Sequence, residues 1–387
     1  MTSAPRCVFY RTLAMVDDPI SGSDVRPAKL LQAFRQLGYD VDVVAGPAGV
    51  RKQAIERVKQ NILDGVRYEF LYAEPPTTPI LLNESHHLPT HPFADYGFLS
   101  FCHSHRIPIV LFYCDVQWRL PDYPKRIGWA KYLAALPFFH LDLYVYRKVV
   151  DALLVPDLGM LRQIAGWASE KPNWASIPGF DPLEMPPAAQ PVAAGAPLRL
   201  FYVGGVTPPV YDLTPLLQGS AWAASHGVSH ELTICCRQAE WLRRPAAYDH
   251  FLDAHVTVVH NRNRQELLEL YSRHDIAVMP YGTLNSDWAM PVKFPEAIGM
   301  ELPILAGRDT AVGQVVAEQG IGWTVGGSEE DLYAVLKGVD RTELERVRAA
   351  VMPVRPSYEW AERAREIVAI AQELRAEQGD RVPGVPG

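Results

Sequence analysis

The strongest constraint on the fold is a regular alternation of β-forming and helical segments. It begins with CVFYRTLAM (7–15), which is rich in β-forming residues and is followed by a turn containing Asp, Pro, Gly and Ser. The next segment places Leu30, Phe34 and Leu37 at helical spacing, stops at Gly38, and leads into a second strand, YDVDVV. A helix of this length between two strands predicts a right-handed parallel crossover. We therefore expect an α/β fold built on parallel sheets.

The alternation is interrupted once, in the middle of the chain. Strands are predicted before the break at 107–113 and 151–157, and a second series opens after it at 198–205 and continues to a strand at 275–281. The break itself, DPLEMPPAAQPVAAGAP (181–197), is dense in Pro and Ala and has no periodicity, which is typical of a linker. Two alternating series joined by a linker predict two doubly wound domains.

The length of the chain also favours two domains, because 387 residues are too many for one ordinary hydrophobic core. The last long segment with helical periodicity is amphipathic and precedes a short tail, GDRVPGVPG. We predict domains at 1–180 and 198–356, a linker at 181–197, a helix at 357–378 and a disordered tail at 379–387.

Composition and charge exclude several classes of protein. Hydrophobic residues make up 48% and charged residues 21%, which is typical of a globular enzyme. The net charge is -7 and the basic residues are scattered, which argues against a nucleic-acid partner. The five cysteines form no C-x-x-C, and the N-terminus lacks a signal-peptide core, so we expect a cytoplasmic protein. Every apolar run is too short to cross a bilayer, which leaves peripheral contact with the inner face of the membrane.

Several segments, taken in order, resemble one known group of enzymes. VMPYGTLNSDWAMPVKFPEAIGMELPILAG (278–307) looks like the donor-site segment of GT-B glycosyltransferases, especially the retaining family 4 group. GSDVRPAKLLQAFRQLGYDVDVV is similar to the family's opening loop, helix and second strand, and SIPGFDP to its inter-domain turn. The resemblance implies two facing Rossmann-like domains, with the C-terminal helix packing back on the first domain. It also implies transfer of a sugar from a nucleoside diphosphate, without a metal or other cofactor.

Two departures from the family bear on the stereochemistry of the reaction. Trp288 stands where the family often has a first Glu, eight residues before Glu296. The remaining M-P-x-K-x-x-E resembles a variant found among polysaccharide-assembly transferases, including inverting members. Tyr113, Cys114 and Asp115 occupy the place of a common histidine. The family favours a retaining mechanism, and the variant leaves an inverting one open.

Lys293 and Glu296 are the central candidates for binding the donor. As the glycosidic bond breaks, negative charge builds on the leaving diphosphate, and an enzyme without a metal must meet it with backbone amides and a fixed cation. The spacing of the two residues puts both on one face near the start of a helix. We assign Lys293 to the pyrophosphate, and the resemblance assigns Glu296 to the ribose hydroxyls. The alternative is an exposed Lys–Glu pair of little energetic value.

Other residues of the second half complete this predicted donor site. Gly204 and Gly205 end a strand where a side chain would block the approach of a phosphate, although a plain turn explains them equally well. Arg237 is a second candidate cation, unless it is a solvated surface residue. His260 and Asn261 end the strand that lies beside the base in the family, or form a polar loop. The donor segment itself adds Tyr281, Met290, Pro291 and Val292.

The first half contributes fewer candidates. Gly22 and Ser23 lie in the loop before the first helix, which in the resembling family approaches the donor phosphate or the acceptor. Asp115 ends a buried strand, where a carboxylate could remove the acceptor's proton in an inverting reaction or orient substrate in a retaining one. The alternative for Asp115 is a capped turn.

Two further patterns bear on a metal site, and a third bears on contact with a membrane. A histidine-rich region lacks standard zinc-ligand spacing and favours surface or acceptor-loop residues (His86, His87, His91, His103 and His105). Asp40 and Asp42 spell the D-x-D of another transferase fold but lie inside a predicted strand. The segment 122–150 mixes aromatic and basic residues, which suits peripheral contact with a membrane or two ordinary core helices.

We therefore predict a glycosyltransferase that uses a UDP-sugar in preference to a GDP-sugar. The acceptor is expected to be a glycan, a lipid-linked sugar or a small molecule. Two alternatives stay open, a nucleotide-sugar epimerase of the same architecture and a non-catalytic nucleotide-sugar-binding module.

Overall fold

The computed structural model describes residues 4–17, 19, 22–164, 171–186, 195–279 and 287–380. The chain divides into two compact units. The first combines Met1–Ile177 with Trp360–Gly387, and the second is Pro178–Glu359.

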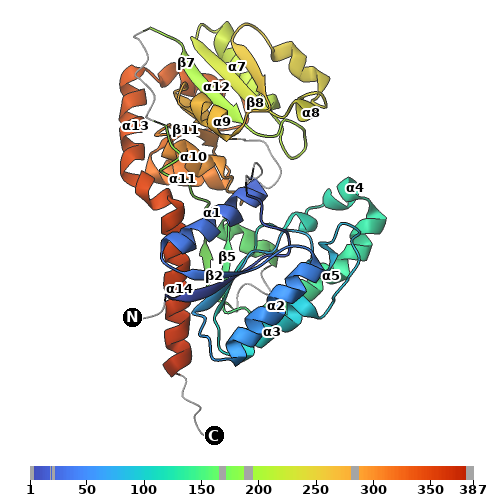
Figure 1. The fold of residues 1–387 in the computed structure, drawn as a ribbon. Helices are drawn as coiled ribbons and strands as arrows, with labels where there is room; N and C mark the ends of the chain where they lie inside the picture. The colour runs from blue at the N-terminus through green and yellow to red at the C-terminus, as the bar shows by residue number, and fades with distance from the viewer. Residues whose placement is uncertain are drawn as a thin grey trace. The chain divides into compact units, whose positions relative to one another are not determined.

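The first unit is built on a parallel sheet whose four inner strands are short and almost fully buried, as expected when helices cover both faces (Figure 1). Its described strands follow the order β2 (Asp40–Val44), β1 (Arg6–Tyr10), β3 (Phe70–Ala73), β4 (Ile109–Phe112), β5 (Ala152–Val155) and β6 (Asn173–Ala175). The strand order reverses between β1 and β3, so the carboxyl ends of these two strands form the switch point of the sheet.

Two groups of helices cover this sheet (Figure 1). Helix α1 (Gly22–Gln36) lies against α14 (Trp360–Asp380), the last helix of the chain. Helix α2 (Ala48–Leu63) contacts α3 (Ala94–Ser104), which in turn contacts α5 (Trp129–Val149). Short segments complete the unit, namely α4 (Tyr123–Ile127) and the 3-10 turns Ile80–Leu82, Gln117–Arg119 and Leu158–Ile164.

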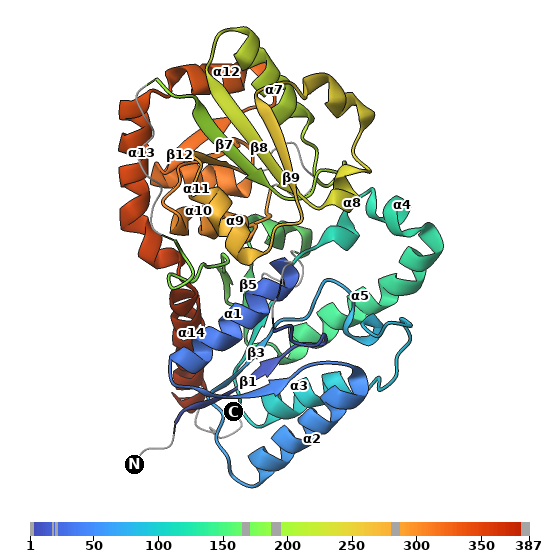
Figure 2. The same ribbon diagram turned by 45° about the horizontal axis from the view of Figure 1, so that its top comes forward.

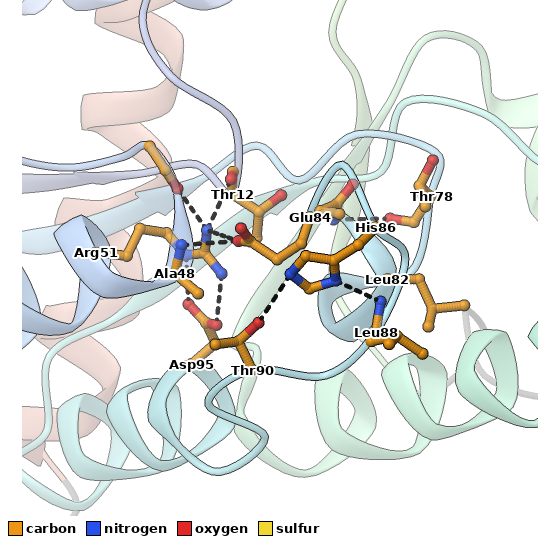
Figure 3. A network of polar contacts seen from close by, with 12 residues as sticks. Thr12, Ala48, Arg51, Thr78, Leu82, Glu84, His86, Leu88, Thr90 and Asp95 are labelled. Carbon is orange, nitrogen blue, oxygen red and sulfur yellow. Dashed lines mark hydrogen bonds and ion pairs between the residues drawn. The ribbon is translucent and has the colours of Figure 1, made fainter.

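A buried charge network ties α2 and α3 to the ends of two strands (Figure 3). Arg51 of α2 donates from Nε and Nη2 to both carboxylate oxygens of Asp95 in α3, at 2.9 and 2.8 Å. Its Nη1 donates to the carbonyl oxygens of Thr12 and Gly46, at 2.8 and 2.5 Å. Tyr10 adds a third donor to Asp95, at 2.9 Å. The guanidinium therefore fixes the backbone that leaves β1 and β2.

The second unit contains another parallel sheet, shown face-on with β7, β8 and β9 side by side in Figure 2. Its described strands follow the order β12 (Gly322–Val325), β11 (Ile304–Gly307), β10 (Ile276–Val278), β7 (Leu198–Val203), β8 (His230–Cys236) and β9 (Val256–His260). Counted from β7, this is the 3-2-1-4-5-6 arrangement of a dinucleotide-binding fold. The order reverses between β7 and β10.

The helices of the second unit begin with side-chain caps at several places. Asn263, Thr310, Ser328 and Asp340 each accept a hydrogen bond from the first turn of the following helix. The described helices are α7 (Thr214–Ser225), α8 (Gln238–Trp241), α9 (Arg264–Tyr271), α10 (Lys293–Gly299), α11 (Ala311–Gln319), α12 (Glu329–Gly338) and α13 (Arg341–Val354), with 3-10 turns at Ala246–Phe251 and Arg355–Tyr358.

The predicted element boundaries shift at several points. The first strand covers 6–10 rather than 7–15, and the last helix begins at Trp360 because a 3-10 turn occupies residues 355–358. That helix continues to Asp380, into the predicted tail, whereas 381–387 and the linker residues 187–194 lie outside the described part of the chain. The two ends of the second unit meet as a parallel bridge between Phe180 and Glu359.

Candidate functional site

The candidate site lies at the switch point of the second sheet, where β7 and β10 run side by side. Gly204 and Gly205 follow β7 directly, and the chain after β10 leads to Lys293, the first residue of α10. In open parallel sheets a ligand binds at the carboxyl ends of the strands on either side of such a reversal. The topology therefore puts the predicted glycine turn and the predicted cation at the same edge.

Lys293 Nζ lies near the glycine turn. A Cβ atom added to Gly204 would lie 3.5 Å from Lys293 Nζ and 2.9 Å from Tyr202 Oη. A Cβ on Gly205 would lie 2.2 Å from the Tyr211 ring, so any side chain at Gly205 would displace that ring. The Tyr202 hydroxyl donates to the Gly205 carbonyl oxygen at 2.5 Å and holds the turn. A side chain at either glycine would therefore require a neighbouring tyrosine to move.

The environment of Lys293 favours an anion. Burial by the surrounding protein lowers the pKa of its ammonium group, and the charge of Arg237 lowers it further, while Glu296 and Glu240 act in the opposite direction. Within the described residues, Nζ forms no hydrogen bond or ion pair with a protein group. A bound phosphate would supply a counter-charge in direct contact with Nζ.

Glu296 is buried, with 5% of its surface exposed, and it pairs with an arginine instead of Lys293. Arg264 of α9 donates from Nη1 to Glu296 Oε1 at 2.5 Å and from Nε and Nη2 to Glu184 Oε2 at 3.3 and 3.2 Å. Burial raises the pKa of Glu296, and the charges of Arg264 and Lys293 oppose that rise. The exposed Lys–Glu pair considered from the sequence is therefore not what the structure contains.

Comparison with known proteins then identifies the architecture. No family model and no curated protein matches the sequence. Solved structures do match over almost the whole chain. Sucrose-phosphate synthase from Thermosynechococcus elongatus shares 13% identity at a TM-score of 0.58, with 96% of this chain and 100% of that one covered. The chain has the GT-B fold.

Two other GT-B neighbours extend the comparison. HepE from Anabaena, solved in complex with UDP-glucose, shares 11% identity at a TM-score of 0.54, with 97% of this chain and 100% of that one covered. A putative UDP-N-acetylglucosamine 2-epimerase from Listeria monocytogenes shares 11% identity at a TM-score of 0.52, with 97% and 98% covered. The likeness confirms the predicted fold of two parallel-sheet domains. In this structure α14 packs on the first unit, against α1.

The remaining candidates in the second unit follow β8 and β9, at the same edge of the sheet. Arg237 precedes α8 with 62% of its side chain exposed, 3.9 Å from Glu240. Asn261 adopts a left-handed backbone conformation (φ 52°) after β9, and its side chain accepts from the Gln238 amide at 3.0 Å. The Nδ1 atom of His260 lies 3.4 Å from the Cys236 carbonyl oxygen.

The segment leading into α10 is described only in part. Met290 and Trp288 are buried, whereas Pro291 and Val292 are partly exposed. The backbone amide of Phe294 donates to the Pro291 carbonyl oxygen at 3.0 Å, which closes the first turn. Tyr281 lies outside the described residues.

In the first unit, Asp115 follows β4 and is held by its own turn and by the distant Thr77. It accepts hydrogen bonds from Thr77 Oγ1 at 2.5 Å and from the Gln117 amide at 3.1 Å. Burial raises the pKa of Asp115, and these hydrogen bonds limit the rise. Gly22 and Ser23 begin α1, both exposed, and Arg11 donates to the Ser23 carbonyl oxygen at 3.0 Å.

The structure describes the histidine-rich region and the candidate membrane segment as well. No three His, Cys, Asp or Glu side chains among the described residues are grouped to hold a metal ion. His86 instead bonds the Leu88 amide and the Thr90 hydroxyl within its own loop (Figure 3). Among the described helices, none combines the length and the hydropathy needed to cross a bilayer.

Sequence reasoning missed two residues of the candidate site, Arg264 and Glu184. Arg264 is 32 positions from Glu296, and Glu184 is 80 positions from Arg264. No local motif connects them. The only sequence signal is the capping box of α9, Asn263 with Glu266, which fixes where Arg264 stands on its helix.

Proposed function

We propose that this chain is a glycosyltransferase that transfers a sugar from a nucleoside diphosphate donor, UDP in preference to GDP. The observation that carries the proposal is the proximity of Lys293 Nζ to the Gly204 turn at the β7–β10 switch point. A cation above a glycine turn at this edge suits a diphosphate, since the backbone approaches closely and the charge is fixed. A protein of the same fold solved with UDP-glucose supports the choice of donor.

Each residue has a role in this proposal. Lys293 binds the pyrophosphate and stabilises the charge that develops on the leaving diphosphate, which lets the reaction proceed without a metal. Gly204 and Gly205 admit the phosphates, and Glu296 accepts hydrogen bonds from the ribose hydroxyls. Asp115 faces the acceptor: with inversion it takes the acceptor's proton, and with retention it orients the substrate. The anomeric configuration of the product, measured by NMR, decides between these two roles.

A nucleotide-binding experiment tests the proposed donor. UDP and UDP-sugars at about 100 times their Kd are expected to stabilise the folded protein by about 2.7 kcal/mol, because they bind only the folded state. GDP and GDP-sugars are expected to give a smaller increase in Tm under the same conditions. An unchanged Tm with every nucleotide sugar would contradict the proposal.

An epimerase is the second candidate function, favoured by the Listeria neighbour of the same fold. An epimerase acts on the donor alone, whereas a transferase needs an acceptor. Exchange of solvent deuterium into the nucleotide sugar in the absence of an acceptor would identify an epimerase. Consumption of the donor only after an acceptor is added would identify a transferase.

We further propose that α5 contacts an anionic membrane that carries a lipid-linked acceptor. Trp129, Leu133 and Tyr144 are 58–62% exposed along one face of α5, and Arg147 and Lys148 lie at its end. Apolar side chains next to basic ones match the interfacial region of such a membrane.

Vesicle sedimentation tests this contact. The protein is expected to sediment with vesicles containing phosphatidylglycerol and much less with phosphatidylcholine alone, because the basic residues require anionic lipid. Leu133→Glu is expected to lower the bound fraction severalfold, since it places a charge in the apolar face. Leu63→Glu, at an exposed position of α2, is the matched control and should bind normally. Equal binding by both variants would contradict the proposed face.

A further inference from the structure

We infer that Arg264 is a positioning residue of the donor site, which holds Glu296 in place for the ribose and is itself held by Glu184. The inference rests on the proposed function, because it concerns how Glu296 receives a nucleotide. Arg264 itself is not assigned a contact with the substrate.

One guanidinium joins the two carboxylates. Nη1 of Arg264 reaches Glu296 Oε1 at 2.5 Å, while Nε and Nη2 both reach Glu184 Oε2, at 3.3 and 3.2 Å. The Glu296 side chain is 7% exposed, whereas those of Arg264 and Glu184 are 31% and 30% exposed. Water can therefore solvate Glu184 but hardly reaches Glu296, which depends on Arg264 for a counter-charge.

The backbone fixes Arg264 at the right place. It is the first residue of α9 and lies within the capping box, in which Asn263 and Glu266 bond each other's backbone amides at 2.9 and 3.0 Å. A planar guanidinium presents donors in a fixed fork, so it can span two carboxylates that a lysine ammonium would contact one at a time.

Glu184 is fixed as well, and by the same helix that carries Glu296. On one side, the backbone amide of Phe180 donates to the Tyr358 carbonyl oxygen at 2.9 Å. The ring of Phe180 packs on Gly299 of α10. On the other side, the sulfur of Met185 lies 3.0 Å from the position of a Cβ on Gly299. The segment 180–185 therefore packs against the end of α10, which keeps Glu184 within reach of Arg264.

This arrangement leaves one carboxylate oxygen for a ligand. Arg264 uses Oε1 of Glu296, and no described residue donates a hydrogen bond to Oε2. Two ribose hydroxyls need an ionised carboxylate that accepts from both. Burial raises the pKa of Glu296, and the charge of Arg264 is the largest of the effects that lower it. Arg264 thus opposes the effect of burial, favours the ionised form of Glu296, and directs its second oxygen.

The test compares Arg264→Met, Arg264→Lys and Arg262→Met by calorimetric titration with UDP and with 2′,3′-dideoxy-UDP between pH 6 and 8.5. Arg262 is a matched control, since it is two residues away and lies 3.8 Å from Glu266. Arg264→Met is expected to weaken UDP binding about tenfold or more, whereas Arg262→Met should bind like the unaltered protein. Arg264→Lys is expected to be intermediate, because it restores the charge without the fork.

Two readouts separate positioning from a merely structural role. First, dideoxy-UDP lacks the hydroxyls that Glu296 accepts, so Arg264→Met should change its affinity little. Second, removal of Arg264 raises the pKa of Glu296 further, and only the ionised form binds. UDP affinity of Arg264→Met should therefore fall as the pH falls toward 6, while that of the unaltered protein stays flatter. If Arg264→Met does not fold, Glu184→Gln is expected to give the same pattern with a smaller loss.

The outcomes distinguish this inference from the proposed function. If Glu296→Gln weakens UDP binding but the Arg264 variants bind UDP normally at every pH, Arg264 contributes only to the stability of the fold and the inference is overturned. If neither Glu296→Gln nor Lys293→Met affects UDP binding, the donor site itself is wrong and both proposals fall. A loss in Arg264→Met that is equal for UDP and dideoxy-UDP also overturns the positioning role.

Discussion

Lys293→Met is expected to lower kcat for sugar transfer by about 100- to 1000-fold, the usual effect of removing one group that stabilises developing negative charge. Lys293 Nζ lies at the Gly204 turn, where the leaving diphosphate would acquire its charge. Because burial already lowers the pKa of this ammonium group, removing it should not destabilise the protein. The loss is therefore expected in kcat and in UDP affinity, with Tm unchanged.

Initial-rate kinetics with the donor identified by thermal shift measure this effect. Lys337→Met is a suitable control, because Lys337 is fully exposed on α12 and its ammonium group bonds Tyr333 of the same helix at 3.0 Å. Lys293→Arg should retain part of the activity, since it keeps the charge with a different geometry. Activity of Lys293→Met within a factor of two of the unaltered protein would exclude the proposed role.

Arg51→Met is expected to destabilise the first unit by about 3–5 kcal/mol, the cost of leaving a buried charge without its partner. The substitution leaves Asp95, 2% exposed, without its guanidinium, and leaves the carbonyl oxygens of Thr12 and Gly46 without a donor. Such a loss is a large share of the stability of an ordinary domain.

Urea denaturation, monitored by circular dichroism, measures the change in the free energy of unfolding. Arg57→Met is the matched control on the same helix. Arg57 is 58% exposed, and its ion pair with Asp42 is long, at 4.0 Å. This substitution should change the free energy of unfolding by no more than about 0.5 kcal/mol. Arg51→Met/Asp95→Leu should recover part of the stability, since it removes both charges of the pair. An equal midpoint for Arg51→Met and Arg57→Met would show that the network in Figure 3 contributes little.

The sheets could be predicted from the sequence because buried parallel strands are short runs of β-forming residues. The runs IPIVLFY and DALLVPD contain β4 and β5, and DIAVMPY contains β10. Helix α3 was not predicted, because ADYGFLSFCHS contains a glycine and several aromatic residues and few strong helix formers. It forms because Phe98, Leu99 and Cys102 are buried, which is tertiary packing that no local propensity reveals.

Part of the candidate site could also be proposed from the sequence. The motif located Lys293 and Glu296, since their spacing and the preceding loop lie within one segment. Their partners were not predictable, because the side chain that meets Glu296 depends on how α9 packs beside α10. Arg262 and Arg264 are equally basic and almost adjacent in the sequence, and only the packing shows that the second contacts Glu296.

The bridge between Phe180 and Glu359 has a topological consequence. The second unit is an insertion within the first, and this isolated bridge joins its entry to its exit. An excised fragment spanning 178–359 would therefore have adjoining termini, a favourable arrangement for independent expression or circular permutation. Truncation before Trp360 would instead remove α14, and so deprive the first unit of the helix that lies against α1 while leaving the second unit whole.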